Sequence, residues 1–188
     1  MHNIKILIIG EVYVDQHLDI IENGYSTSRL GGIFHAARSC DALNIEYALA
    51  YYAPDYLVKD VEKFGIDVLR ASSIFRLGKV DKAPNVMLIG QSDESGNQLY
   101  ENILGRQAEY VSMLPFMQVL DDFDPTDIII FPGRYGNAGI LSNLSNYEGK
   151  IHIDMNYDCD DILDLDTIKI QTVFLSTSST SFEEFFKE

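Results

Sequence analysis

The sequence has few basic residues, few cysteines and no long apolar run. Its 188 residues include 14 Lys and Arg against 29 Asp and Glu, for a formal net charge of −15. Nucleic acids and anionic membrane surfaces are bound by clustered Lys and Arg, so we expect neither partner. The two cysteines, Cys40 and Cys159, lie far apart and outside any metal-binding spacing, which favours reduced thiols.

No apolar run is long enough to cross a bilayer, and the N-terminal residues lack the pattern of a signal peptide, so we expect a cytoplasmic protein. The sequence also lacks a Gly-x-x-x-x-Gly-Lys-Ser/Thr loop, a Gly-x-Gly-x-x-Gly run after its first apolar segment, and a Gly-x-Ser-x-Gly run. These absences argue against P-loop NTPases, dinucleotide dehydrogenases and serine hydrolases. The four histidines have no zinc spacing, and the acidic residues at 154–166 lack the order of a calcium loop, so we predict no metal site.

The apolar residues are distributed as in an α/β fold. Unbroken apolar runs of strand length are typical of strands buried on both faces of a parallel sheet, whereas apolar residues three and four positions apart favour helices. We expect strands at residues 4–9, 46–53, 127–131, 150–153 and 172–175, and helices at 34–43 and 56–64, the second with Asp55 as its N-cap. This alternation predicts a doubly wound domain. Residues 85–90 and 98–104, joined by a polar turn, predict a β-hairpin instead.

Two segments near the N-terminus carry candidate ligand-binding groups. The first strand is followed by Gly10 and, five residues later, by Asp15. Ligands bind beyond the carboxyl ends of strands in open α/β sheets, where a carboxylate can accept hydrogen bonds from two hydroxyl groups. Gly31 and Gly32 precede the first helix and would let a polar ligand approach the backbone, and His35 could bind a hydroxyl through either ring nitrogen. The alternatives are ordinary turns at Asp15 and the glycines, and a core role for His35.

Gly10, Asp15 and the Gly31-Gly32 pair resemble the amino-terminal half of the ribokinase-like, or PfkB-type, carbohydrate kinases. The resemblance implies a Rossmann-like three-layer αβα fold with a small β-lid formed near residues 12–22 and 85–105. It also implies that Asp15, Gly31, Gly32 and His35 bind a sugar or nucleoside, with His35 standing where the family has Asn. In that family the lid often makes the dimer contact.

A second part of the resemblance lies at residues 151–156, which look like the family's strand ending in Asp-x-Asn. The resemblance implies that Asn156 contacts phosphate, while Asp158 stands where many members have Arg. ATP and Mg²⁺ are the cofactors implied for the complete fold. The family's Asn-x-x-Glu motif for magnesium is not restored near residues 176–186, where Ser181 and Glu184 have the spacing expected of a capping box.

The family's Gly-Ala-Gly-Asp motif, which supplies the catalytic base, is absent from the 188 residues. We therefore expect a single partial ribokinase-like domain over residues 1–188, with its carboxy-terminal part missing, no catalytic residue and no phosphate transfer by this chain alone. A sheet that ends at residues 172–175 would leave an uncovered edge, so we expect a homodimer or a complementary chain.

The alternative is a non-catalytic sugar-binding or assembly protein that retains the kinase fold, and the missing motifs favour it. Residues 133–137 fit either an anion-binding turn around Arg134 or a plain connection between two elements.

Overall fold

The computed structural model describes residues 4–22, 25–92, 98–103, 108–131, 140, 143–156 and 169–176. Its helices are α1 (Phe34–Ala42), α2 (Val58–Lys63) and α3 (Phe116–Phe123), and α2 is flanked by a 3-10 turn, η1 (Asp55–Leu57), and a π-helical turn, η2 (Phe64–Val68). Its strands are β1 (Lys5–Glu11), β2 (Val14–Glu22), β3 (Tyr25–Leu30), β4 (Glu46–Ala53), β5 (Ser73–Asp81), β6 (Val86–Ser92), β7 (Gln98–Ile103), β8 (Glu109–Ser112), β9 (Asp127–Ile130), β10 (Lys150–Asn156) and β11 (Ile170–Ser176).

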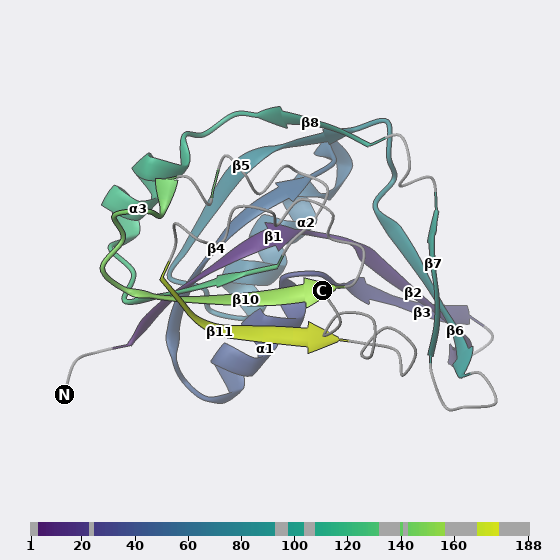
Figure 1. The fold of residues 1–188 in the computed structure, drawn as a ribbon. Coiled ribbons are helices and arrows are strands. Elements are labelled where there is room, and N and C mark those ends of the chain that lie inside the picture. Colours follow the sequence, from purple (N-terminus) through teal and green to yellow (C-terminus); the bar gives the residue numbers. More distant parts are fainter. Residues whose placement is uncertain are drawn as a thin grey trace, which may run out of the picture.

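Seven strands form a large sheet in the order β11-β10-β9-β1-β4-β5-β8. All neighbouring pairs are parallel except β5 and β8, which are antiparallel. The carboxyl ends of the parallel strands therefore share one edge of the sheet (Figure 1). The five strands expected from apolar runs are confirmed as β1, β4, β9, β10 and β11.

The side chains of β1 alternate between two apolar layers. Leu7 and Ile9 pack in one layer, which also contains Val119 of α3, whereas Ile8 packs in the other with Phe34 of α1. All five side chains are fully buried, because the central parallel strand is covered on both faces. Helices thus lie on both sides of the large sheet, and the predicted three-layer αβα arrangement is confirmed.

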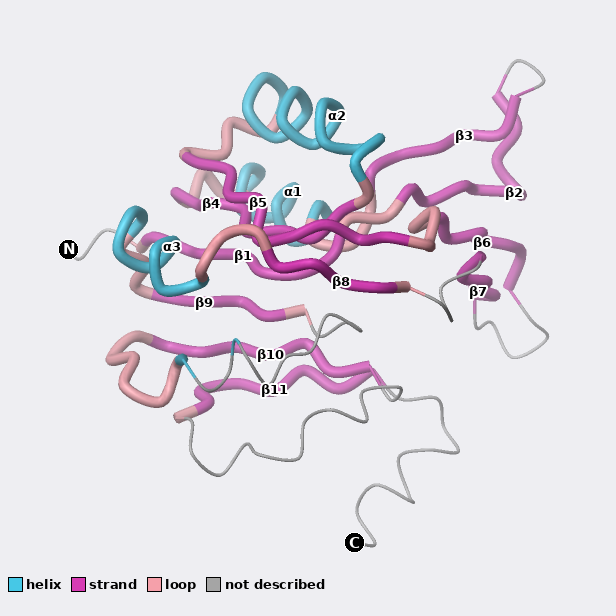
Figure 2. The backbone as a smooth tube through the Cα atoms, turned by 90° about the horizontal axis from the view of Figure 1, so that it is seen from above, coloured by secondary structure: helices cyan, strands magenta, loops and turns pink. Residues whose placement is uncertain are grey.

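Four strands form a separate small sheet in the order β3-β2-β6-β7. It consists of two antiparallel hairpins, β2 with β3 and β6 with β7, joined by parallel pairing of β2 and β6. Figure 2 shows these strands projecting together from one end of the large sheet. The hairpin predicted at residues 85–90 and 98–104 is confirmed as β6 and β7.

The helix predicted at residues 56–64 differs from the structure. The α-helical part begins only at Val58, after η1, and Asp55 makes no capping hydrogen bond. Its carboxylate instead lies 2.6 Å from Arg76 Nη2 and 2.8 Å from Lys79 Nζ, both on β5. The N-cap prediction for Asp55 is therefore wrong, because two cations from a neighbouring strand bind the carboxylate. The sequence analysis also missed β5 itself, in which these two charges interrupt the apolar run.

Within the part of the chain that the structure describes, no helix has both the length and the apolar composition needed to cross a lipid bilayer.

Candidate functional site

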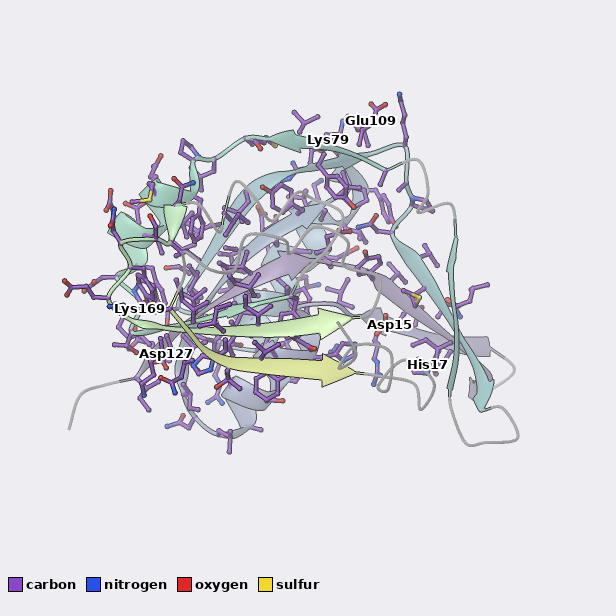
Figure 3. The ribbon with its side chains drawn as sticks, viewed as in Figure 1. Asp15, His17, Lys79, Glu109, Asp127 and Lys169 are labelled. Atoms are coloured by element: carbon purple, nitrogen blue, oxygen red, sulfur yellow. The ribbon has the colours of Figure 1, made fainter. Side chains whose placement is uncertain are left out.

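Asp15 lies where the chain passes from the large sheet to the small one. It is the second residue of β2, which starts three residues after the end of β1. Figure 3 shows Asp15 and His17 beside the end of the large sheet that faces the small sheet, with Asp127 and Lys169 at the opposite end of the large sheet. The Asp15 residue is only 4% exposed. A carboxylate is thus held at the carboxyl edge of the parallel strands, as the sequence predicts.

The structure brings Asp15 and Gly31 into direct contact. The Gly31 N–H donates to Tyr13 O over 2.8 Å, which holds the glycine turn against the start of β2. A Cβ atom at Gly31 would lie 2.2 Å from both carboxylate oxygens of Asp15. Gly32 has a φ of +62°, and a Cβ there would lie 2.1 Å from Glu11 O. Both glycines are therefore needed for the chain to pass this close to β1 and β2.

Two basic side chains face the Asp15 carboxylate. His35 Nε2 on α1 lies 3.0 Å from Asp15 Oδ2, and Arg29 Nε on β3 lies 3.8 Å from the same oxygen. Both side chains are half exposed, in contrast to the buried carboxylate. The His35 contact is close but not aligned as a hydrogen bond, and no donor among the described residues makes one to Asp15 Oδ2. A buried carboxylate oxygen thus remains free to accept a hydrogen bond.

His17 is a site residue that the sequence analysis did not single out. It follows Asp15 by two positions on β2, so both side chains lie on the same face of the strand. The residue is 8% exposed, and its Nε2 has no hydrogen-bond partner within the described residues. The two-residue spacing was the available signal. It became informative only with the burial of both side chains, which the structure shows.

Arg38 of α1 lies behind this site. Its Nη2 donates to Leu30 O over 2.7 Å, and its guanidinium lies over the Phe64 ring with 5.6 Å to the centroid. Burial lowers the pKa of Arg38 and the charge of Arg29 lowers it further, whereas Asp15 opposes both effects. The Asp15 carboxylate is thus surrounded by three basic side chains, although the protein as a whole is strongly acidic.

The fold agrees with solved structures, although no family model and no curated protein matches the sequence. Ribokinase from Giardia lamblia matches with a TM-score of 0.60 and 15% identity, over 87% of this chain and 55% of its own. Fructokinase from Xylella fastidiosa matches with a TM-score of 0.56 and 12% identity, over 80% of this chain and 50% of its own. The microbiome-derived acarbose kinase Mak1 matches with a TM-score of 0.55 and 13% identity, over 98% of this chain and 66% of its own. The chain has the ribokinase-like fold.

The match covers only part of that fold. This chain spans between 50% and 66% of the length of these three structures. At such low sequence identity the comparison establishes the architecture, which is a large αβα layer carrying a small sheet at one end. The shared fold therefore does not establish an activity for this chain, and any function has to be argued from its site residues.

Asn156, which the resemblance assigns to phosphate, ends β10 and pairs in register with Ser176 of β11. Its backbone lies at the same carboxyl edge of the ribokinase-like sheet as the end of β1. Asp158, Cys159, the turn at residues 133–137 and residues 177–188 lie outside the described residues. Among those that are described, no three or more His, Cys, Asp or Glu side chains gather so as to hold a metal ion.

A cavity of about 410 Å³ lies between β3 and the α2–η2 segment of the ribokinase-like domain. Its lining is mainly apolar and includes Val14, Leu30 and Phe64. Arg29 lines it as well, but Asp15 and His35 do not. The cavity therefore lies beside the Asp15 site, and only Arg29 belongs to both.

Proposed function

We propose that this chain forms the acceptor-binding part of an ATP-dependent carbohydrate or nucleoside kinase, acting in the cytoplasm. The observation that carries the proposal is a pair of buried polar atoms on one face of β2 that make no hydrogen bond among the described residues. Asp15 Oδ2 is buried without a hydrogen-bond donor and His17 Nε2 is buried without a partner among the described residues. A carboxylate accepts from hydroxyl groups and an imidazole nitrogen can accept or donate, so a molecule with several hydroxyls would satisfy both atoms.

The surrounding residues suit a polyol that is bound against the backbone. The glycine at position 31 lets the chain pass directly against the Asp15 carboxylate, and His35 stands half exposed at that carboxylate. Three of the solved structures with this fold are named as kinases of carbohydrates: ribokinase, fructokinase and acarbose kinase. Their names support a sugar-like acceptor for this chain too.

The proposed reaction is transfer of the ATP γ-phosphoryl group to an acceptor hydroxyl, in which positioning and charge stabilisation provide most of the catalysis. Asp15, Gly31, Gly32 and His35 position the acceptor, and the small sheet acts as a lid that excludes water. Asn156 contacts phosphate at the sheet edge. The base and the main contacts to ATP and Mg²⁺ would come from outside this chain, so a homodimer alone would stay inactive and a complementary chain would be needed for transfer.

Acceptor binding can be tested by thermal unfolding of the purified chain with D-ribose, D-fructose, myo-inositol or adenosine. A ligand that binds only the folded state, at 100 times its dissociation constant, stabilises that state by about 2.7 kcal/mol. We expect at least one of these compounds to raise Tm for the wild type and none to do so for Asp15→Asn, whose amide NH₂ cannot accept a hydrogen bond. Asp41→Asn is the matched control, because Asp41 pairs with Arg70 on the surface, and it should respond as the wild type does. Absence of any shift in the wild type would refute the proposal.

A sugar-binding or assembly protein without kinase activity is the second candidate. It is favoured by the missing Asn-x-x-Glu motif near residues 176–186 and by Asp158 in the place of Arg. The two functions can be distinguished by adding a complementary segment that carries the Gly-Ala-Gly-Asp motif. If its addition yields phosphate transfer from MgATP to the bound acceptor, the chain is part of a kinase. If binding persists without transfer, the sugar-binding function is correct.

A further inference from the structure

Glu11, the last residue of β1, is a buried carboxylate that holds three side chains together. Tyr13 Oη donates to its Oε2 over 2.8 Å, and Asn85 Nδ2 donates to the same oxygen over 3.2 Å. Tyr110 Oη donates to its Oε1 over 2.8 Å. Glu11 is only 4% exposed, and each of these donors comes from a different segment of the chain. The cluster of Glu11, Tyr13, Asn85 and Tyr110 is here called the Glu11 cluster.

The members of the Glu11 cluster lie at the passages between the two sheets. The chain passes from the large sheet to the small sheet after Glu11 and after Asp81, and it returns after Leu30 and after Ile103. Tyr13 lies in the first of these passages and Asn85 in the passage between β5 and β6. Tyr110 is the second residue of β8, just after the last return.

Further hydrogen bonds that involve backbone atoms join Glu11 and Asn85 to the neighbouring passages between the two sheets. The Ile33 N–H, in the return from β3 to α1, donates to Glu11 O over 3.1 Å. Asn85 Nδ2 also donates to Val12 O over 3.1 Å, and Asn85 O accepts from the Val14 N–H over 2.8 Å. Glu11 is therefore bonded within or directly beside every passage of the chain between the two sheets.

A carboxylate suits this place because all three side-chain partners donate to it. Charge-assisted hydrogen bonds are stronger than neutral ones, and an ionised carboxylate offers acceptor sites on both oxygens. A glutamine could keep the arrangement, since its amide oxygen can accept from Tyr13 and Asn85 while its NH₂ donates to the Tyr110 hydroxyl. Alanine would leave three buried donors without this acceptor.

We infer that Glu11 is a positioning residue. It fixes the angle between the large sheet and the small sheet, which carries Asp15. Asp15 and His17 project from the first residues of the small sheet, only four and six positions beyond Glu11, whereas His35 belongs to α1, which packs on the large sheet. The distance between the Asp15 carboxylate and His35 therefore depends on the angle between the two sheets. This inference rests on the proposed function for its effect on acceptor binding, but the effect on the small sheet is independent of any ligand.

Tyr110→Phe tests the effect on acceptor binding. It removes one hydroxyl from the Glu11 cluster, and a hydrogen bond to a charged group corresponds to about a tenfold change in an equilibrium constant or somewhat more. We expect the dissociation constant of the polyol found by thermal shift, measured by titration calorimetry, to rise about tenfold. Tyr147→Phe is the matched control, because Tyr147 Oη donates over 2.8 Å to Pro125 O, at the other end of the sheet. Equal effects of the two substitutions on binding would overturn the inference.

Hydrogen exchange of the ligand-free chain tests the position of the small sheet directly. In Glu11→Ala we expect faster exchange of the amides of β2 and β6 than in the wild type, with the amides of β9 and β10 unchanged. Glu11→Gln should restore slow exchange. If exchange accelerates equally in both sheets, or in neither, Glu11 has no positioning role. If the wild type binds no polyol while this pattern is observed, the proposed function fails and the inference about the small sheet stands.

Discussion

Gly31 lies so close to Asp15 that a Cβ atom on the glycine would be 2.2 Å from both oxygens of the carboxylate. Asp15 is the second residue of β2, and Gly31 directly follows the last residue of β3. The Gly31 N–H donates a hydrogen bond to Tyr13 O, which holds the glycine turn against β2. The position of the carboxylate is therefore set by the absence of a side chain at residue 31.

Gly31→Ala should displace the Asp15 side chain and abolish acceptor binding. Insertion of a methyl group into a closely packed site costs about 1–3 kcal/mol, so we also expect a lower free energy of unfolding. Both quantities can be measured by chemical denaturation with and without the polyol. Gly65→Ala is the control: its Cβ would meet the flexible end of Ile74, with Cδ1 at 2.6 Å, and not the Asp15 carboxylate. Acceptor binding retained by Gly31→Ala would contradict the site geometry.

Substitution by Phe should change the free energy of unfolding differently at Tyr47 and at Tyr51. Both residues are buried in β4, but Tyr47 Oη donates to Leu69 O, whereas Tyr51 Oη has no hydrogen-bond partner among the described residues. Tyr47→Phe should lower the free energy of unfolding by about 1 kcal/mol, because Leu69 O loses its donor. Tyr51→Phe should leave it unchanged or raise it, because burial of an unpaired hydroxyl is itself unfavourable. Urea unfolding of the two variants would show this difference, and a large loss in Tyr51→Phe would contradict it.

Alkaline conditions should unfold the protein between about pH 10 and pH 12. Burial is the main cause that raises the pKa of Tyr47, Tyr51 and Tyr147 to about 12 each. Above pH 10 the unfolded chain releases these protons while the folded chain retains them, so the folded state binds more protons and its stability falls as pH rises. Thermal unfolding across this range should show a falling Tm, and the fall should be smaller in Tyr51→Phe. A Tm that is independent of pH between 10 and 12 would count against burial of the phenols.

Asp154 and Asp55 should affect the pH dependence of stability in opposite directions. Burial raises the pKa of Asp154 above its ordinary value of 3.8, so its ionisation destabilises the folded state as pH rises above that value. Hydrogen bonds from Lys79 and then Arg76 lower the pKa of Asp55, so its ionised form stabilises the folded state, and this contribution is lost as pH falls below 3.8 through the lowered pKa.

At pH 7, Asp154→Asn should therefore raise Tm and Asp55→Asn should lower it, as measured by calorimetry. Both differences should shrink in acid, where the wild-type carboxyls are protonated. Shifts of the same sign for the two variants at pH 7 would contradict the opposite contributions assigned to the buried Asp154 and the ion-paired Asp55.

The elements that could be predicted from the sequence are those in which local pattern and burial agree. The unbroken apolar runs of β1 and β4 indicated strands covered on both faces, and the spacing of apolar residues such as Ala37 and Cys40, both buried in α1, indicated a helix. β5 was missed because Arg76 and Lys79 interrupt its apolar residues. Their charges are tolerated in a strand because Asp55 binds both, and that contact is not visible in a local pattern.

The sequence by itself determined the α/β class, the strand that precedes Asp15 and the glycine turn before α1, because hydrophobic periodicity and glycine conformation act within a few residues of chain. Only the tertiary structure decided which of these groups meet. Asn85 and Tyr110 bond to Glu11 from 74 and 99 residues away, and Gly31 contacts Asp15 because the β2–β3 hairpin folds back in one particular register. Contacts between distant segments depend on strand order and on the angle between the two sheets, and no local pattern encodes either.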